Sequence, residues 1–274
     1  MTPLLQIDQL AVRFAANGTP ENNVLAGVNL EIFSTETLAL VGESGCGKST
    51  VARAILRLIA PPGKITSGKI YYRGEDLLAL SEKRMRQIRW KEIAMIFQET
   101  GSALNPLRRA GSQVVEVLRL HLGVNKKAAK IKTLELFESV ALPEATRCFE
   151  AYPHELSSGM RQRVLIAMAL ACMPKLIIAD EPTTALDARH QQEILVQLLA
   201  LKDKVGLGLL FITHDFGLIA KWADRVAIMH EGRIIEAGAS GEILARPQHA
   251  HTMKLLAAAK RFHQTDLTNY AGTA

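Results

Sequence analysis

The segment GESGCGKST, from Gly42 to Thr50, constrains the fold of this chain more than any other stretch. It matches the pattern G-x-x-x-x-G-K-[ST] and stands between an uninterrupted apolar run, Thr37 to Val41, and a helical pattern that starts near Lys48. Glycines in such a loop let the backbone turn tightly, so that its N–H groups surround a phosphate chain at the helix N-terminus. We therefore predict a parallel sheet with crossover helices that binds a phosphorylated ligand through this loop.

The lysine of this motif supports the same interpretation. A lysine in the first turn of a helix opposes the helix dipole, so Lys48 is locally unfavourable unless an anion occupies the loop. We expect Lys48 to reach the β- and γ-phosphates of a nucleotide and the Ser49 hydroxyl to ligate Mg²⁺. Because Cys46 stands at the same helix N-terminus, we also expect a lowered pKa for its thiol. The predicted nucleotide-contacting residues are Gly42, Glu43, Ser44, Gly45, Cys46, Gly47, Lys48, Ser49 and Thr50.

A second apolar run, Lys175 to Ala179, ends in two adjacent carboxylates. Asp180 can hold the magnesium ion, and Glu181 is placed to polarise a water molecule for attack on the γ-phosphate. The next predicted strand, Gly208 to Thr213, is followed at once by His214. Ligands of open α/β sheets bind at the carboxyl ends of the strands, so we expect His214 to contact the γ-phosphate or the attacking water.

The remaining segments predict three further parts. The first third holds short alternating runs typical of an antiparallel sheet, and a hairpin is expected to turn at Glu231 and Gly232. Residues 100–156 carry amphipathic helical patterns without a strong strand signal, which indicates a helical insert. His249, His251 and His263 follow near the end, where no acid or cysteine completes a ligand set, so we expect a polar helix start there rather than a metal site.

Composition excludes several classes of protein. With 274 residues and 48% apolar content the chain can bury a large core, yet its longest apolar run, Val164 to Met173, is far shorter than the roughly 20 residues of a membrane span. We expect no signal peptide, because the N-terminus lacks a basic stretch followed by an apolar one. Three widely spaced cysteines argue against disulfides, a zinc site or an iron–sulfur cluster, and the net charge of +6 is dispersed.

Four segments, GESGCGKST, LSSGMRQR, LIIADEPTTALD and ITHD, occur in an order and spacing that resembles the ATP-binding subunit of an ATP-binding cassette (ABC) transporter. The resemblance extends from the first strand to about His251. It implies an α/β P-loop NTPase fold of the ABC ATPase type: a mixed-sheet core with an antiparallel β-subdomain and an inserted α-helical subdomain. The implied boundaries are residues 1–98 and 163–245 for the core, 99–162 for the helical signature subdomain, and 246–274 for a C-terminal tail.

The resemblance also implies roles for single residues. Phe14 looks like the aromatic residue that stacks on adenine, Gln98 like the glutamine that senses Mg²⁺ and the attacking water, and Asp187 like the aspartate that couples the two subunits' sites. LSSGM is similar to the family signature, so Ser157, Ser158 and Gly159 are expected to cover nucleotide held by another subunit. Glycine is typical at position 158, and a serine there would cost about 1 kcal/mol if the backbone needed a positive φ.

The implied activity is ATP hydrolysis with ATP and Mg²⁺ as ligands. The catalytic group would be Glu181, His214, Gln98 and Lys48, and the metal ligands would be Ser49, Gln98 and Asp180. The implied partners are a second ATPase subunit, identical or paralogous, a transmembrane permease and, indirectly, a solute-binding protein. Such a subunit is expected to lie peripherally on the cytoplasmic face of the cell (inner) membrane.

Within the family, the segments FQETGSALNP, YPHELSSGMRQR and RPQHAHTMKLL look most like the group that imports peptides and nickel. The cargo suggested is therefore a di- or oligopeptide, nickel or a metal chelate. The alternatives are an exporter-type cassette and a soluble ABC ATPase associated with nucleic acid. We expect no nucleic-acid partner, because the chain has neither a long coiled-coil insertion nor a second cassette.

Overall fold

The computed structural model describes residues 2–15, 22–98, 103–182 and 188–259. Asp187 lies outside the described residues. The chain divides into two compact units: unit 1 comprises Met1–Leu78 and Phe211–Ala274, and unit 2 comprises Ala79–Leu210. The domain boundaries expected from the family resemblance stay a prediction.

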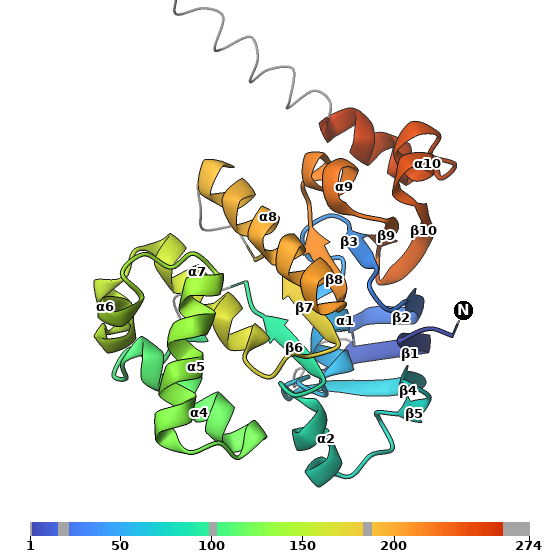
Figure 1. Ribbon diagram of the computed structural model, residues 1–274. Helices are drawn as coiled ribbons and strands as arrows, with labels where there is room; N and C mark the ends of the chain where they lie inside the picture. The colour runs from blue at the N-terminus through green and yellow to red at the C-terminus, as the bar shows by residue number, and fades with distance from the viewer. Residues whose placement is uncertain (1, 16–21, 99–102, 183–187, 260–274) are drawn as a thin grey trace, which may run out of the picture. The chain divides into compact units, whose positions relative to one another are not determined.

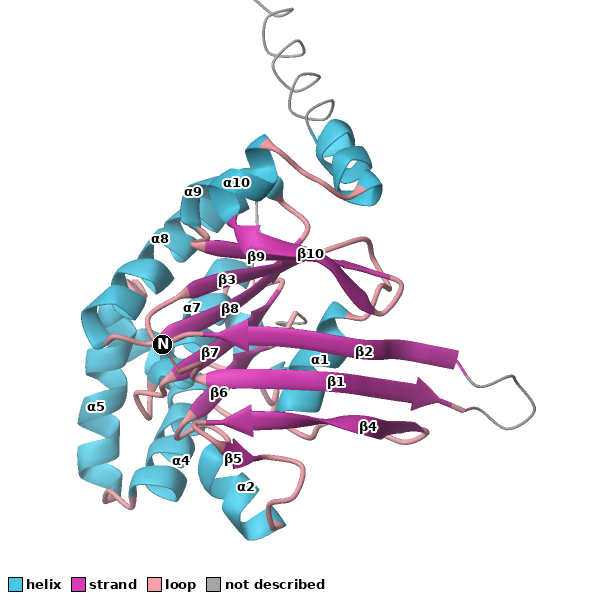
Figure 2. Ribbon diagram, turned by 90° about the vertical axis from the view of Figure 1, so that its right-hand side faces the viewer, coloured by secondary structure: helices cyan, strands magenta, loops and turns pink. Residues whose placement is uncertain are grey.

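Unit 1 contains the antiparallel sheet expected from the alternating runs, with strand order β2-β1-β4-β5 (Figure 2). Leu5 of β1 pairs with Ile32 of β2 on one side and with Tyr72 of β4 on the other, and all three side chains are buried. The alternation of apolar and polar residues thus places one face of this sheet in the core. The bounds are β1 (Leu5–Phe14), β2 (Asn22–Ile32), β4 (Gly63–Tyr72) and β5 (Glu75–Asp76).

A second sheet has the strand order β10-β9-β3-β8-β7-β6. Strand β3 pairs with β9 in parallel, β6 pairs with β7 in parallel, and β9 and β10 form an antiparallel hairpin. All residues of β3 and of β7 are buried, as expected for strands covered on both faces. The bounds are β3 (Thr37–Val41), β6 (Ile93–Ile96), β7 (Leu176–Asp180), β8 (Gly208–Thr213), β9 (Arg225–His230) and β10 (Arg233–Ala239).

The hairpin turn of unit 1 contacts the predicted phosphate loop. Glu231 and Gly232 have φ values of 44° and 74°, which suits a two-residue turn whose twist matches the strands, so the predicted hairpin is confirmed. Glycine is required at position 232, since a Cβ there would lie 2.5 Å from the carbonyl oxygen of Val24. The Gly232 N–H donates to the Cys46 carbonyl at 3.1 Å, and the Ala26 N–H donates to the Gly232 carbonyl at 2.9 Å.

The turn between β2 and β3 contains a threonine in a conformation that favours glycine. Thr35 has a φ of 64°, a left-handed conformation that L-residues with a Cβ rarely adopt. Glu36 closes this turn, because its carboxylate accepts the Phe33 N–H at 2.7 Å. The turn therefore forms with a strained residue at its tip.

Helices of unit 1 pack against strands of the second sheet. Asp215 caps α9 by accepting the N–H groups of Gly217 and Leu218 at 2.7 and 3.1 Å. Ile219 of α9 and Ile243 of α10 belong to one buried apolar cluster with residues of β3 and β9. The helices are α1 (Lys48–Ile55), α9 (Phe216–Trp222) and α10 (Ser240–Ala245), and residues 250–259 are also helical.

Unit 2 contains the helical segment predicted between residues 100 and 156, drawn in green in Figure 1. The helices approach closely where α4 meets α6, since a Cβ on Gly111 would lie 2.2 Å from the Phe149 ring. Phe137 of α5 and Leu118 of α4 are fully buried in this unit. The bounds are α2 (Glu82–Ile88), α4 (Ala110–Leu122), α5 (Lys126–Ser139), α6 (Ala145–Glu150), the 3₁₀ helix η1 (Pro153–Glu155), α7 (Ser158–Leu170) and α8 (Ala188–Val205).

Candidate functional site

The predicted phosphate loop in unit 1 connects the end of β3 to the start of α1, as its sequence context requires. Gly45 and Gly47 have φ values of 80° and 111°, in the region where only glycine is unstrained. A Cβ on Gly42 would lie 2.2 Å from the Met229 carbonyl oxygen, so the loop packs directly on the end of β9. The glycines of the motif are therefore explained by backbone geometry and close packing.

The loop presents positive charge and backbone donors. Lys48 is only 6% exposed, and its ammonium group donates to the carbonyls of Gly42 and Glu43, at 2.8 Å each. Gly47 caps α1 without any side-chain hydrogen bond, and the first turn contains no acidic residue. N–H groups at such a helix end favour an anion. A glycine-lined loop with a buried lysine thus fits a phosphate chain.

Cys46 corrects one of the sequence-based expectations. Burial raises the pKa of its thiol above 9.0, and the nearby Lys48 charge together with backbone hydrogen bonds offsets this only in part. Cys46 is 8% exposed, and its Sγ lies 3.9 Å from Lys48 Nζ. The expected lowering of the pKa was wrong, because removal of the thiol from water outweighs the Lys48 charge and the backbone hydrogen bonds at this helix end.

Unit 2 brings together two polar side chains that are far apart in sequence. Strands β6 and β7 pair in parallel, with Ile96 opposite Ala179, so the residues that follow each strand emerge at the same edge. Gln98 Nε2 donates to Glu181 Oε2 at 2.7 Å. Asp180, which ends β7, is 2% exposed. A buried carboxylate and an amide-supported carboxylate therefore lie next to each other at the end of β7.

Glu181 adopts an uncommon backbone conformation. Its φ is 45°, in the left-handed region, which costs about 1–2 kcal/mol for a residue with a Cβ. The residue follows five consecutive buried positions of β7. Such strain persists only where the surrounding structure imposes it, and it is concentrated at functional positions of proteins.

The other two predicted residues of unit 1 lie at strand ends. His214 is exposed and follows β8 directly; on its C-terminal side Asp215 donates its N–H to Thr213 Oγ1 at 3.1 Å and caps α9. The Phe14 ring, at the end of β1, packs over Gly63, where a Cβ would lie 2.5 Å from its Cε1. This is a packing contact within the sheet, and the adenine-stacking role of Phe14 stays a prediction.

The signature segment of unit 2 forms the start of α7. Ser157 is the N-cap residue, and its hydroxyl accepts the Met160 N–H at 3.2 Å. Ser158 is the first residue of the helix and has ordinary helical geometry. The possibility of a positive φ at Ser158, with its cost of about 1 kcal/mol, is therefore wrong: the N-cap stands one residue earlier, and the serine at 158 causes no such strain.

The two arginines of the signature segment have structural partners. Arg161 Nη1 donates to the carbonyls of Leu156 and Pro153, at 2.6 and 3.3 Å. Arg163 Nη1 donates to the Val140 carbonyl at 2.7 Å and also to the Gln197 side chain. The arginines thus hold the loop before α7 and tie the helix to its neighbours, which sequence reasoning did not foresee.

Among the residues that the structure describes, no helix is both long enough and apolar enough to cross a lipid bilayer.

Comparisons with known proteins agree with the geometry. The family model described as "ABC transporter" matches residues 25–184. The oligopeptide transport ATP-binding protein OppD of Bacillus subtilis (strain 168) is 47% identical over 277 residues, which cover 100% of this chain and 77% of that protein. The dipeptide transport ATP-binding protein DppD of Haemophilus influenzae is 43% identical over 259 residues, covering 94% and 78%.

Among solved structures, a dimeric post-hydrolysis state of the ATP-binding cassette MJ0796 bound to ADP and Pi is similar, with a TM-score of 0.77 and 28% sequence identity. The match covers 86% of this chain and 98% of that one. The expected fold class, a mixed-sheet core with an antiparallel β-sheet and inserted helices, is confirmed.

Proposed function

Because this chain belongs to the ABC transporter family of ATP-binding cassettes, we propose that it is the ATP-hydrolysing subunit of an importer that carries peptides across the cell membrane. The observation that carries the hydrolytic part is the hydrogen bond from Gln98 to Glu181 beside the buried Asp180. The cargo is supported by relatives named as oligopeptide and dipeptide transport proteins. None of the relatives described above is named for nickel or a chelate, so peptides are the preferred cargo.

We infer that the loop from Gly42 to Thr50 binds the phosphates of ATP. In the structure described above, the Lys48 ammonium group is held by two carbonyl oxygens of the same loop. A phosphate oxygen can replace these neutral acceptors and form a charge-assisted hydrogen bond, which is about twice as strong. The N–H groups of the first turn of α1 would bind the same phosphates.

The donor set for Mg²⁺ would be the Ser49 hydroxyl, the Asp180 carboxylate and the Gln98 side-chain oxygen. All are oxygen ligands, which Mg²⁺ requires, and Asp180 is buried at the end of a rigid strand. Such an ion neutralises charge on the phosphates when bound. The chemistry of these donor atoms therefore fits the ion.

Glu181 would act as the general base that accepts a proton from the attacking water. The Gln98 amide supports this role, because its donated hydrogen bond at 2.7 Å orients the carboxylate. His214, exposed at the end of β8, would contact the γ-phosphate or the water. Phe14 would stack on adenine through its ring face.

The site would be completed by a second subunit, identical or paralogous. We propose that Ser157, Ser158 and Gly159 at the start of α7 cover nucleotide bound to the partner, while Asp187 couples the two sites. Ser158 and Gly159 are partly exposed, and the arginines of the segment are turned to carbonyls of their own chain. The related MJ0796 cassette is described as dimeric, which supports this arrangement for the present chain.

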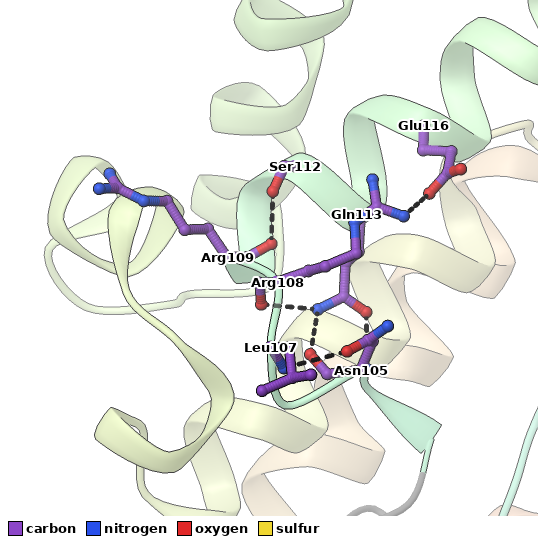
Figure 3. A network of polar contacts seen from close by, with 7 residues as sticks. All are labelled: Asn105, Leu107, Arg108, Arg109, Ser112, Gln113 and Glu116. Atoms are coloured by element: carbon purple, nitrogen blue, oxygen red, sulfur yellow. Dashed lines mark hydrogen bonds and ion pairs between the residues drawn. The ribbon is translucent and has the colours of Figure 1, made fainter.

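A membrane permease would contact unit 2 beside the segment that follows Gln98. Leu107 is 85% exposed, yet its loop is fixed by Gln113, which accepts the Asn105 N–H at 2.9 Å and donates to the carbonyls of Asn105 and Arg108 at 3.1 and 3.0 Å (Figure 3). An apolar side chain held outward by a rigid loop suits a protein contact. The subunit would thus lie peripherally at the cytoplasmic face of the membrane, and a solute-binding protein would deliver the peptide to the permease.

The substitution Glu181→Gln tests the hydrolytic role. The variant should bind ATP, lose most phosphate release and accumulate as a dimer with ATP, because the amide cannot accept the proton from water. Glu144→Gln, at an exposed glutamate of the same unit, is the matched control and should behave as wild type. Unchanged turnover in Glu181→Gln would remove this residue as the base.

The transport role is tested in cells that lack the gene. Peptide uptake should be restored by the wild-type chain and not by Glu181→Gln, and the chain should co-purify with a permease from solubilised membranes. Retention on nucleic acid without a membrane partner would contradict the proposal and favour the soluble class of ABC ATPase.

A further inference from the structure

Three side chains from distant parts of the sequence meet beside the phosphate loop of unit 1. Glu43 belongs to the loop, His230 ends β9, and His251 lies in the helical segment 250–259. Their ligand atoms, one carboxylate oxygen and two imidazole nitrogens, all lie within 4.8 Å of one another. From the sequence alone, no acid completed a ligand set with the terminal histidines, but the fold places Glu43 beside His251.

The contacts within this cluster leave a nitrogen for a ligand. The rings of His230 and His251 stack with centroids 3.6 Å apart and an angle of 27° between their planes. His251 Nε2 lies 3.8 Å from Glu43 Oε1, which is longer than a hydrogen bond, and it is buried without a hydrogen-bond partner among the described residues. A buried polar atom without a partner is costly, and a metal ion is one way to satisfy it.

The backbone around the two histidines is held in place. His230 pairs with Arg233 in the hairpin of β9 and β10. The turn of this hairpin is bound to the phosphate loop, because the Gly232 N–H donates a hydrogen bond to the Cys46 carbonyl. The start of the helical segment is bound by Glu236, whose carboxylate accepts the N–H groups of Gln248 and His249 at 2.7 and 3.2 Å. Both imidazoles are thus presented by fixed backbone, while the Glu43 side chain is 58% exposed and can rotate.

The donor set selects a class of ion. Imidazole nitrogen suits Zn²⁺, Ni²⁺, Co²⁺ and Cu²⁺, whereas Mg²⁺ and Ca²⁺ take oxygen ligands. Two histidines and one glutamate with a fourth position open to water is an arrangement known for zinc.

We propose that Glu43, His230 and His251 form a binding site for a divalent transition metal ion next to the phosphate loop. Ligands of tetrahedral Zn²⁺ are about 3.4 Å apart at the usual bond lengths. The three ligand atoms lie within 4.8 Å of one another, so they would reach this spacing by rotation of the Glu43 side chain and separation of the two stacked rings. The Glu43 side chain is 58% exposed, so its carboxylate can make this rotation.

A bound ion would tie the helical segment 250–259 to the loop. The Glu43 carbonyl accepts a hydrogen bond from the Lys48 ammonium group. The ion, bound by the Glu43 carboxylate, and the phosphate-binding lysine would therefore contact the same residue. Binding of the two ligands would then be coupled, and the coupling would be equal in both directions. Through this site, the helical segment 250–259 would affect the affinity of the phosphate loop for nucleotide.

Titration of the full-length chain, prepared without a histidine tag, tests the site. Co²⁺ serves as the probe through its visible absorption, and Zn²⁺ is measured by competition. His230→Phe and His251→Phe keep the aromatic stack but remove a ligand nitrogen. His249→Asn is the matched control, because His249 Nδ1 accepts the His251 N–H at 3.1 Å and asparagine can still accept it.

We expect one ion per chain in the wild type and in His249→Asn, and at least about 10-fold weaker binding in each phenylalanine variant, since even indirect partners of metal ligands account for 10–100-fold. The proposal would be overturned if the phenylalanine variants bound the ion as tightly as the wild type does, or if His249→Asn weakened binding as much as the phenylalanine substitutions do.

A second measurement uses the wild-type chain and does not depend on the variants folding. Zn²⁺ should protect His230 and His251 from diethyl pyrocarbonate, as read by mass spectrometry, and should slow amide exchange in residues 250–259. His154, exposed in unit 2, should be modified at the same rate with and without Zn²⁺. Unchanged modification of both cluster histidines would show that the ion binds elsewhere.

Discussion

Replacing Gln98 with leucine removes the N–H group that donates to Glu181 at 2.7 Å while keeping a side chain of similar size. A hydrogen bond to a charged group contributes about 1.5–3 kcal/mol, and the lower value applies because Gln98 is exposed to solvent. If this bond orients the carboxylate in the transition state, its loss lowers kcat roughly 10-fold, since about 1.4 kcal/mol corresponds to a factor of ten in rate.

The assay is phosphate release at saturating ATP, combined with equilibrium binding of ATP in the absence of Mg²⁺. We expect a lower kcat and an unchanged ATP affinity, because Gln98 would contact the water and the ion rather than the nucleotide itself. Gln87→Leu, at an exposed glutamine of α2, is the matched control and should keep wild-type kcat.

Gln98→Glu provides a pH-dependent counterpart. A second carboxylate beside Glu181 would disfavour ionisation of the pair and raise the pKa of the base. The base would then be deprotonated only at higher pH, so the acid limb of the pH–rate profile should move upward while activity recovers in alkaline buffer. A wild-type kcat in Gln98→Leu together with an unshifted profile in Gln98→Glu would refute the role of this hydrogen bond.

Three further predictions concern other parts of the chain. Thr35→Gly should raise the free energy of unfolding by about 1 kcal/mol in urea denaturation, because φ is 64° there; equal stability would show that the turn is unstrained. Leu107→Asp should abolish co-purification with a permease but leave ATP binding by the isolated chain intact. Burial raises the pKa of the Cys46 thiol and raises that of Cys172 to about 11. At pH 8 both thiols should therefore react with a disulfide reagent far more slowly in the folded chain than after unfolding, and the reaction should become faster as the pH rises. A fast reaction in the folded chain would contradict the burial of these cysteines.

Local patterns were sufficient to predict the parts of the site that local geometry determines. The loop around Gly45 and Gly47 follows from a buried strand, a turn that requires glycine and a helix, all within a few residues. The turn at Glu231 and Gly232 is equally local. The antiparallel sheet of β1, β2 and β4 followed from alternation of apolar and polar residues, which has the period of a strand.

Features that depend on long-range packing could not be predicted in this way. The Gln98–Glu181 hydrogen bond depends on the parallel pairing of β6 with β7, between residues about 80 positions apart. The pKa of Cys46 was expected to fall because the helix dipole is visible in sequence, whereas its burial is not. For Ser158, a shift of one residue in the position of the N-cap decides whether the backbone is strained.

The hydrogen bond from the Gly232 N–H to the Cys46 carbonyl has a consequence for the order in which the chain folds. The turn that supports the phosphate loop lies 186 residues further along the chain and is synthesised after it. Contacts between such distant segments form late, after a large loss of chain entropy. A nascent chain therefore carries the complete loop sequence without a stable nucleotide site until this turn has been synthesised, and ATP can stabilise the fold only once the hairpin of β9 and β10 has docked.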